Sequence, residues 1–265
     1  MNFCSLYSGS SGNSIFIGTD NTRILIDAGL PGKKIDEALK SVDEDTTKID
    51  GIFITHEHSD HIKGVGVLSR KYDIPIYANS DTWLAMKSNI GNVKDHNIKI
   101  MDKRSTVSIK DIEIKSFNIP HDAAGPVGYT VSNGKYNCSV VTDIGTFTEE
   151  IKQNIRKSDV ILLESNHDVQ MVKYGPYPYI LKQRILSEIG HLSNENCGEA
   201  IVEIMKYGRQ KHIFLGHLSS TNNQPDLAYQ TVLNVLNENN LELDKDLILK
   251  MASRNNPSEY IRLAK

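Results

Sequence analysis

The sequence predicts an α/β fold, and three observations support this prediction. Short apolar runs recur along the whole chain, and segments with the periodicity of amphipathic helices separate many of them. Side chains that can bind metal ions follow several of these runs, at the strand ends where α/β sheets usually carry their chemistry. The rhythm of strands and helices repeats in the second half of the chain. We therefore expect a single domain over residues 1–265, built from two similar βα halves at about 1–145 and 146–265.

The first expected elements are three strands at residues 3–8, 14–19 and 23–27. A helix from Pro31 to Val42 follows them. The loop between the first two strands is rich in serine and glycine, and its backbone N–H groups can bind an anion. A plain turn between two strands is an equally good interpretation. The candidate phosphate-binding side chains of this loop are Ser10, Asn13 and Ser14.

Asp27 follows three apolar residues that we expect to be buried, so its carboxylate needs a partner. One interpretation is that Asp27 accepts a hydrogen bond from a metal-binding histidine and thereby fixes the orientation of the ring. The alternative is that Asp27 caps the helix that follows.

A histidine-rich segment lies between an expected strand at residues 51–54 and an expected helix at 62–72. His56 and His58 are two positions apart, so in extended backbone their side chains leave on the same side. Asp60 and His61 come after a turn and point to a neighbouring place. One short loop can thus supply ligands to two metal ions about 3.5–4 Å apart. Mixed histidine and aspartate ligands favour a catalytic site for zinc, manganese or iron, whereas a polar turn that caps a helix is the simpler alternative.

The middle of the chain places two more metal-competent side chains at strand ends. The expected strand at 112–119 leads to His121, and the second strand of a hairpin at Asn133-Gly134 leads to Asp143. With the cluster upstream, these become an expected third histidine ligand and a bridging carboxylate. The other elements expected here are a strand at 74–78, a helix at 80–88, and strands at 98–101, 105–109 and 127–132.

The second half contains three further places of interest. His191, Ser193 and Asn194 precede a helix that we expect to end near residue 207, with Ser193 or Asn194 as its N-cap. His217 follows an expected strand at 211–215. An aromatic, proline-broken loop at 174–179 carries three tyrosines, for which packing under the loop is favoured over stacking on unpaired bases. The remaining elements are a helix at 147–156, a strand at 160–164, a helix after residue 225 and a strand near residue 247.

Composition restricts the class of protein. No apolar run approaches the length of a membrane span, and residues 1–20 lack the features of a secretion signal. Cys4, Cys138 and Cys197 are far apart and odd in number, which is typical of reduced thiols rather than disulfides. We therefore expect a cytoplasmic protein. The net charge of −3 disfavours tight nonspecific binding to nucleic acid, although not an enzyme that meets a phosphodiester through metal ions.

Together, these residues resemble the metallo-β-lactamase superfamily over nearly the whole chain. The resemblance implies an αββα four-layer sandwich with a dinuclear metal site at one edge. It also implies that Asp27 supports a ligand from behind and that Asp143 bridges the two metals. One metal would be held by His56, His58 and His121, and the other by Asp60, His61 and His217.

Four loops are similar to those of the bacterial YycJ/WalJ (VicX-type) group, which is associated with 5′-to-3′ DNA exonuclease activity: residues 8–14, 164–168, 190–194 and 216–219. The resemblance implies DNA as the substrate, a role in DNA repair, and a hydroxide between two divalent ions (zinc or manganese, with iron as a further candidate) as the nucleophile. Asp60 would take part in catalysis. His191 is our candidate for the group that protonates the leaving oxygen, because it lies at the start of an expected helix beside Ser193 and Asn194; a capping or packing histidine is the alternative. The phosphate-binding candidates in these loops are His167, His191, Ser193 and Asn194.

Three alternatives stay open at the level of sequence. One is a flavo-diiron redox module, which the lack of an attached flavin-binding domain disfavours. A thioester or lactone hydrolase of the glyoxalase II kind uses the same seven ligand positions. A non-enzymatic accessory protein linked to cell-wall signalling would keep metal only for stability, which a complete pair of half-sites disfavours. The aspartate at position 143, where the best-known β-lactamases have cysteine, disfavours antibiotic hydrolysis. The interval from Asp143 to His217 is too short for the second domain of ribonuclease J.

Overall fold

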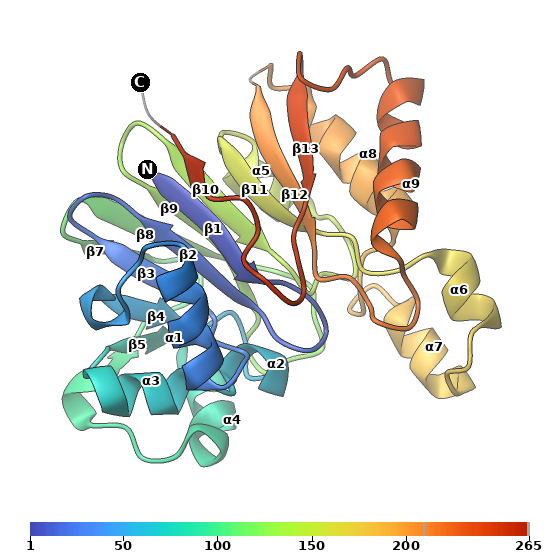
Figure 1. The fold of residues 1–265 in the computed structure, drawn as a ribbon. Helices are drawn as coiled ribbons and strands as arrows, with labels where there is room; N and C mark the ends of the chain where they lie inside the picture. The colour runs from blue at the N-terminus through green and yellow to red at the C-terminus, as the bar shows by residue number, and fades with distance from the viewer. Residues whose placement is uncertain (209, 264–265) are drawn as a thin grey trace.

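The computed structural model describes residues 1–208 and 210–263. In it, two seven-stranded sheets lie face to face, and helices cover the outer side of each (Figure 1). This is the four-layer αββα arrangement, so the predicted fold class is confirmed. Within the two described ranges, no helix combines the length and the apolar character that a bilayer crossing requires.

The first sheet has the strand order β14-β1-β2-β3-β4-β5-β6. Its antiparallel part is β14 (Ile261–Arg262), β1 (Asn2–Tyr7), β2 (Ser14–Gly18) and β3 (Arg23–Ile26), and β3 then continues in parallel with β4 (Gly51–Phe53), β5 (Ile76–Ala78) and β6 (Ile98–Ile100). Three helices pack on its outer face: α1 (Gly32–Ser41), α3 (Val65–Tyr72) and α4 (Ser80–Ile90).

The second sheet has the order β13-β12-β11-β10-β9-β8-β7. Its antiparallel strands are β7 (Thr106–Ile109), β8 (Ile112–Asn118) and β9 (Val127–Ser132), and its parallel strands are β10 (Asn137–Val141), β11 (Val160–Glu164), β12 (Lys211–Gly216) and β13 (Leu247–Met251). The outer helices are α5 (Glu149–Ile155), α8 (Asn194–Met205) and α9 (Pro225–Glu238).

A single apolar core joins the facing sides of the two sheets. The ring of Phe3 in the first sheet lies 5.4 Å from that of Phe214 in the second. Phe53 stacks on Tyr77 within its own sheet and meets Tyr129 of the other sheet edge-on. The hydroxyl of Tyr129 also donates a hydrogen bond to the carbonyl of Ile54. The sheets are thus fixed to each other beside the histidine-rich segment, and we infer that both belong to one domain.

The chain moves from the first sheet to the second between β6 and β7, close to residue 103, rather than near residue 145 as the predicted halves suggest. The C-terminal strand β14 also returns to the first sheet, where it pairs with β1. The expected helix at 62–72 is divided into α2 (Ser59–Ile62) and α3. Gly64 lies at the break, where a Cβ atom would meet the carbonyl of Leu30 at 2.3 Å.

Two short helices project from the second half beside the carboxyl ends of the strands: α6 (Val169–Tyr174) and α7 (Tyr179–Ile185) (Figure 1). The sequence pattern predicts only a proline-broken loop here, because Pro176 and Pro178 interrupt any longer periodicity. The two 3₁₀ turns, Thr46–Lys48 and Asp95–Asn97, were likewise not expected.

Candidate metal centre

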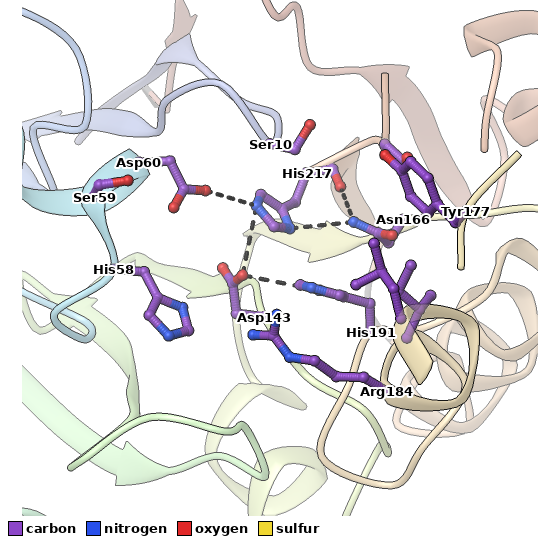
Figure 2. A pocket seen from close by; sticks show the side chains of 13 residues that line it. Ser10, His58, Ser59, Asp60, Asp143, Asn166, Tyr177, Arg184, His191 and His217 are labelled. Atoms are coloured by element: carbon purple, nitrogen blue, oxygen red, sulfur yellow. Dashed lines mark hydrogen bonds and ion pairs between the residues drawn. The ribbon is translucent and has the colours of Figure 1, made fainter. Parts of the chain in front are cut away.

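Seven predicted ligands from both sheets meet where the carboxyl ends of β4, β10 and β12 come together. Figure 2 shows His58, Asp60, Asp143 and His217 around the same cavity. The structure thus brings together side chains that are scattered from residue 56 to residue 217: His56, His58, Asp60, His61, His121, Asp143 and His217.

Three imidazoles form the first half of the cluster. His56 Nε2 lies 3.0 Å from His58 Nδ1, and His58 Nδ1 lies 3.3 Å from His121 Nε2. Asp143 Oδ1 is 3.7 Å from His121 Nε2 and completes this half.

The second half is formed around the other side of Asp143. His61 Nε2 lies 3.2 Å from Asp143 Oδ2 and 3.6 Å from Asp60 Oδ2. His217 Nε2 lies 3.6 Å from Asp60 Oδ2 and 3.5 Å from Asp143 Oδ1. Asp143 therefore faces both halves, as a bridging carboxylate must.

These separations fit a pair of divalent cations. Two ligands that bind one ion tetrahedrally at about 2.0–2.1 Å lie roughly 3.4 Å from each other. Asp143 Oδ2 and His217 Nε2 are buried and have no hydrogen-bond partner in the described part of the chain. Buried polar atoms normally have partners, so lone pairs left unused in a cluster of this spacing indicate metal ligation.

Asp27 and Thr55 support the ligands from behind. The Asp27 carboxylate is fully buried and accepts hydrogen bonds from His61 Nδ1, the Thr55 backbone N–H and the Thr55 hydroxyl, each at 2.8 Å. The Thr55 hydroxyl also lies 3.0 Å from His56 Nδ1. Asp27 does not cap α1, whose N-cap is Pro31 without a side-chain hydrogen bond. These contacts leave the Nε2 atoms of His56 and His61 for metal.

Glu164 is the main site residue that sequence analysis missed. Its side chain is fully buried at the end of β11, and Oε1 accepts hydrogen bonds from Nδ1 of both His217 and His191, each at 2.8 Å. Oε2 accepts the backbone N–H of Ile144. The available signal was a carboxylate at the end of an apolar run, the same signal that singled out Asp27.

The buried charges of the cluster shift the pKa values of its histidines and carboxylates, and these shifts favour positive charge at the site. Burial alone would lower the pKa of His217, but Asp143, Asp60 and Glu164 outweigh this effect and raise it to about 10. Burial raises the pKa of Asp143, but His217 and His61 overcome this and keep it well below its usual range. The pKa of Glu164 falls to about 2 because the neighbouring His191 and His217 outweigh the burial effect. A dense set of buried carboxylates thus demands positive charge.

The backbone is strained at three of these positions. Asp27, Asp143 and His217 have φ values of 59°, 59° and 54°, in the left-handed region that most residues avoid. Each follows the end of a strand, so the turn directs its side chain to the shared edge. Such strain persists at sites where the surrounding contacts fix the conformation.

The serine-rich loop at residues 8–14 does not line the cleft as a phosphate cradle. Its Ser8 hydroxyl accepts the His217 backbone N–H, and the Asn13 backbone N–H donates to the Asp60 carbonyl. Asn13 and Ser14 are fully buried, and the Ser14 hydroxyl donates to the Asp27 carbonyl. The loop therefore clamps the ligand loops from both sheets. Of the three candidates only Ser10 lines the cavity.

The candidates near α8 also divide into buried side chains and one, His191, that lines the cavity. Ser193 is the N-cap, and its hydroxyl accepts the Asn196 N–H. The Asn194 side chain is buried and bonded to Ser165 and Asn223. His167 is buried, and burial lowers its pKa to about 4. These three side chains are buried and do not line the cavity, so we correct them to structural positions. His191, by contrast, lines the cavity and is 21% exposed.

The cavity over the cluster measures about 500 Å³. Besides the predicted residues, Tyr177 and Arg184 line it (Figure 2), and so does Ser219. Arg184 is held by an ion pair with Asp122. Sequence analysis missed Arg184, because nothing in the pattern indicated that the segment around it turns back over the metal ligands.

Comparison with known proteins agrees with this fold. The profile of the beta-lactamase superfamily domain matches residues 22–217. The chain is 42% identical to exodeoxyribonuclease YycJ of Bacillus anthracis over 238 residues, which cover 90% of both proteins. It is also 42% identical to exodeoxyribonuclease WalJ of Streptococcus pneumoniae over 243 residues, 91% of this chain and 90% of that protein.

Among solved structures, the metallo-β-lactamase fold protein YhfI from Bacillus subtilis has a TM-score of 0.71 at 14% identity, covering 97% of this chain and 99% of that one. At that identity the likeness shows the fold alone. The chain belongs to the metallo-β-lactamase superfamily of metal-dependent hydrolases. Within that superfamily it falls in the YycJ/WalJ family, as the resemblance predicted.

Proposed function

We propose that this chain is a dinuclear metal-dependent phosphodiesterase that degrades DNA as a 5′-to-3′ exonuclease. The observation that carries the proposal is the paired half-site, in which one buried carboxylate, Asp143, faces the histidines of both halves. The names of the YycJ and WalJ relatives support a deoxyribonuclease activity. We further propose that the protein acts in the cytoplasm and in DNA repair. Its three buried, unpaired cysteines are compatible with a reducing compartment.

His56, His58 and His121 would hold one divalent ion, and Asp60, His61 and His217 the other, with Asp143 between them. Ions bound there lower the pKa of water toward about 7 and neutralise the charge that develops on phosphorus-bound oxygens. Nitrogen and carboxylate ligands favour zinc or manganese, with iron as a third candidate. Metal analysis of the purified protein decides among them.

His191 is our candidate for the group that protonates the leaving oxygen. Its Nδ1–H donates to Glu164, so Nε2 is the nitrogen left to face a substrate in the cavity. Glu164 fixes the ring and favours its protonated form, which is the arrangement that a general acid needs. Because Glu164 binds His217 through the same oxygen, it also couples the proton donor to a metal ligand.

The first test follows end-labelled, 5′-phosphorylated DNA with each candidate metal. We expect a 5′ label to appear at once as the smallest product, while a 3′ label passes through a ladder of shorter strands. Asp60→Asn and His61→Ala should abolish hydrolysis while the protein stays folded. The matched control is His96→Ala, because His96 is exposed and pairs with Asp73 away from the cluster. Unchanged DNA hydrolysis by Asp60→Asn with metal present would contradict the proposal.

The second test isolates His191. p-Nitrophenolate leaves without a proton, whereas the sugar oxygen of DNA needs one. His191→Ala should therefore slow DNA hydrolysis by about 10²–10⁴-fold and change hydrolysis of bis(p-nitrophenyl) phosphate far less. An equal loss on both substrates, or a loss of bound metal, would remove His191 from the role of proton donor.

The strongest alternative is a thioester or lactone hydrolase, because the same ligands suit that chemistry. A panel of bis(p-nitrophenyl) phosphate, a lactone and a glutathione thioester separates the two activities. Preference for the thioester or the lactone would overturn the nuclease proposal. A protein that binds metal and hydrolyses none of the three would be the non-enzymatic accessory protein.

A further inference from the structure

The helices α6 and α7, with the loop between them, expose large apolar side chains next to the metal centre. Tyr174 is 86% exposed, Tyr179 is 74% exposed and Ile180 is 83% exposed. Such residues are usually buried, and a contiguous group of them on a surface indicates a binding site. The prediction that these tyrosines pack beneath a proline-rich loop is wrong for Tyr174 and Tyr179.

This surface is continuous with the cleft. Tyr177, between the two helices, and Arg184 of α7 line the cavity over the metal ligands (Figure 2). Leu181 and Ile185 of α7 line it as well. Leu181 and Ile185 are four positions apart and thus share the face of α7 that meets the cavity. The same short segment therefore reaches from the reacting centre to the exposed tyrosines.

The charge of the segment favours a polyanion. Residues 169–190 contain Lys173, Lys182 and Arg184 but only one acidic residue, Glu188, in a chain whose net charge is −3. Lys182 lies three positions after Tyr179 and so shares its side of α7. Its ammonium group donates to the Lys173 backbone carbonyl, which brings the Lys182 side chain to the end of α6. Arg184 is already paired with Asp122, so the lysines are the groups offered to phosphates.

We propose that α6, α7 and their loop form a platform on which unpaired bases of a single DNA strand stack as that strand leads to the metal centre. The bases would lie on Tyr174, Tyr177 and Tyr179, while Lys173 and Lys182 meet the backbone phosphates. Aromatic side chains bind bases of any sequence in this way, because every base has a flat face. The inference rests on the proposed nuclease function and adds to it the form of the substrate at the site.

The test uses the full chain loaded with metal, and a fluorescent single-stranded oligonucleotide with phosphorothioate linkages as a slowly hydrolysed probe. Removing a stacking side chain should raise the dissociation constant about 5-fold or more for each tyrosine. Tyr174→Ala/Tyr179→Ala should therefore weaken binding about 25-fold and raise KM on single-stranded DNA. Hydrolysis of bis(p-nitrophenyl) phosphate should stay unchanged, because that substrate reaches only the cleft.

Two controls sharpen the result. Tyr207→Ala removes a tyrosine that is 43% exposed beyond the far end of α8, and it should bind the probe as the wild type does. Tyr174→Trp/Tyr179→Trp keeps flat rings and should retain the affinity. A double alanine variant that binds the probe with wild-type affinity overturns the inference. If that variant instead changes from dimer to monomer with its DNA affinity unaltered, the surface joins two copies of the chain.

The two proposals fail in different ways. If the wild type with metal does not hydrolyse DNA at all, the proposed function is wrong. If the wild type degrades DNA and the tyrosine variants bind and degrade single strands equally well, only the platform is wrong.

Discussion

Replacing Asp27 by asparagine tests how the first sheet controls metal binding. The Asp27 carboxylate accepts three hydrogen bonds at 2.8 Å, one of them from His61 Nδ1. Asparagine has one oxygen, so its NH₂ group must face either Thr55 or His61. Facing His61, it forces the ring proton onto Nε2, which is the atom that meets Asp143 and the metal. Loss of such a supporting contact typically costs 10–100-fold in metal affinity, or about 1.4–2.7 kcal/mol.

The assay is a competition titration with a fluorescent zinc chelator, followed by hydrolysis of bis(p-nitrophenyl) phosphate at saturating metal. We expect one of the two metal equivalents to bind 10–100-fold more weakly, with activity recovered in part at high metal concentration. The matched control is Asp36→Asn, because Asp36 is also buried and accepts a hydrogen bond from a threonine hydroxyl, but on α1 in the outer layer. Equal metal affinity in the Asp27 and Asp36 variants would refute the reasoning.

Four other predictions concern stability. Removing metal with a chelator should lower Tm by roughly 5–10 °C relative to protein in metal at about 100 times Kd, since occupancy at that concentration adds about 2.7 kcal/mol per site; an unchanged melting curve would contradict metal binding by the folded state. Gly29→Ala should lower the free energy of unfolding by about 3 kcal/mol and weaken metal binding, because the added Cβ would lie 1.6 Å from the Asp60 carbonyl oxygen. Gly134→Ala, with φ of +81° but open space around it, should cost about 1 kcal/mol in chemical denaturation and leave metal affinity intact. His167 makes the stability of the protein depend on pH. Its pKa in the folded protein is about 4, below the usual value near 6.5. As the pH falls through this window, His167 binds a proton in the unfolded chain but not in the folded protein, so the folded state is destabilised. About 3 kcal/mol of the free energy of unfolding is lost between those two pKa values. In the presence of chelator, His167→Gln should lack that loss. If urea titrations at pH 7 and pH 4 show the same loss in His167→Gln as in the wild type, the prediction is contradicted.

Local sequence pattern was sufficient wherever one residue's chemistry stood out from its neighbours. The histidines at 56, 58 and 61 are close enough in sequence to indicate a metal site on their own. Asp27 stood out because a carboxylate at the end of an apolar run needs a hydrogen-bonding partner. Most strands were predictable because they are buried runs bounded by turns, and the partly exposed β6 and β7 because their residues alternate. The two-residue strand β14 was not predicted. Pattern was insufficient for α6 and α7, whose few turns and two nearby prolines give no helical period.

Most of the phosphate-binding candidates lie outside the cavity, for a different reason. Small hydroxyl and amide side chains serve equally as anion ligands and as clamps between loops. The choice depends on which way a loop faces, which local sequence does not encode. At Asn13 the amide bonds to the Gly9 carbonyl and lies 3.2 Å from His61 Nε2, so it stabilises the ligand loop.

The metal centre is supported in the same way from both sheets. Asp27 follows β3 of the first sheet and binds Nδ1 of His61, while Glu164 ends β11 of the second and binds Nδ1 of His217. Each sheet thus supplies one buried carboxylate behind one histidine of the same half-site. Since the two carboxylates belong to different sheets, the distance between these histidines depends on how the sheets pack. The core that holds the sheets together therefore also fixes the geometry of the second half-site, and a change between the sheets should act on metal affinity without touching a ligand.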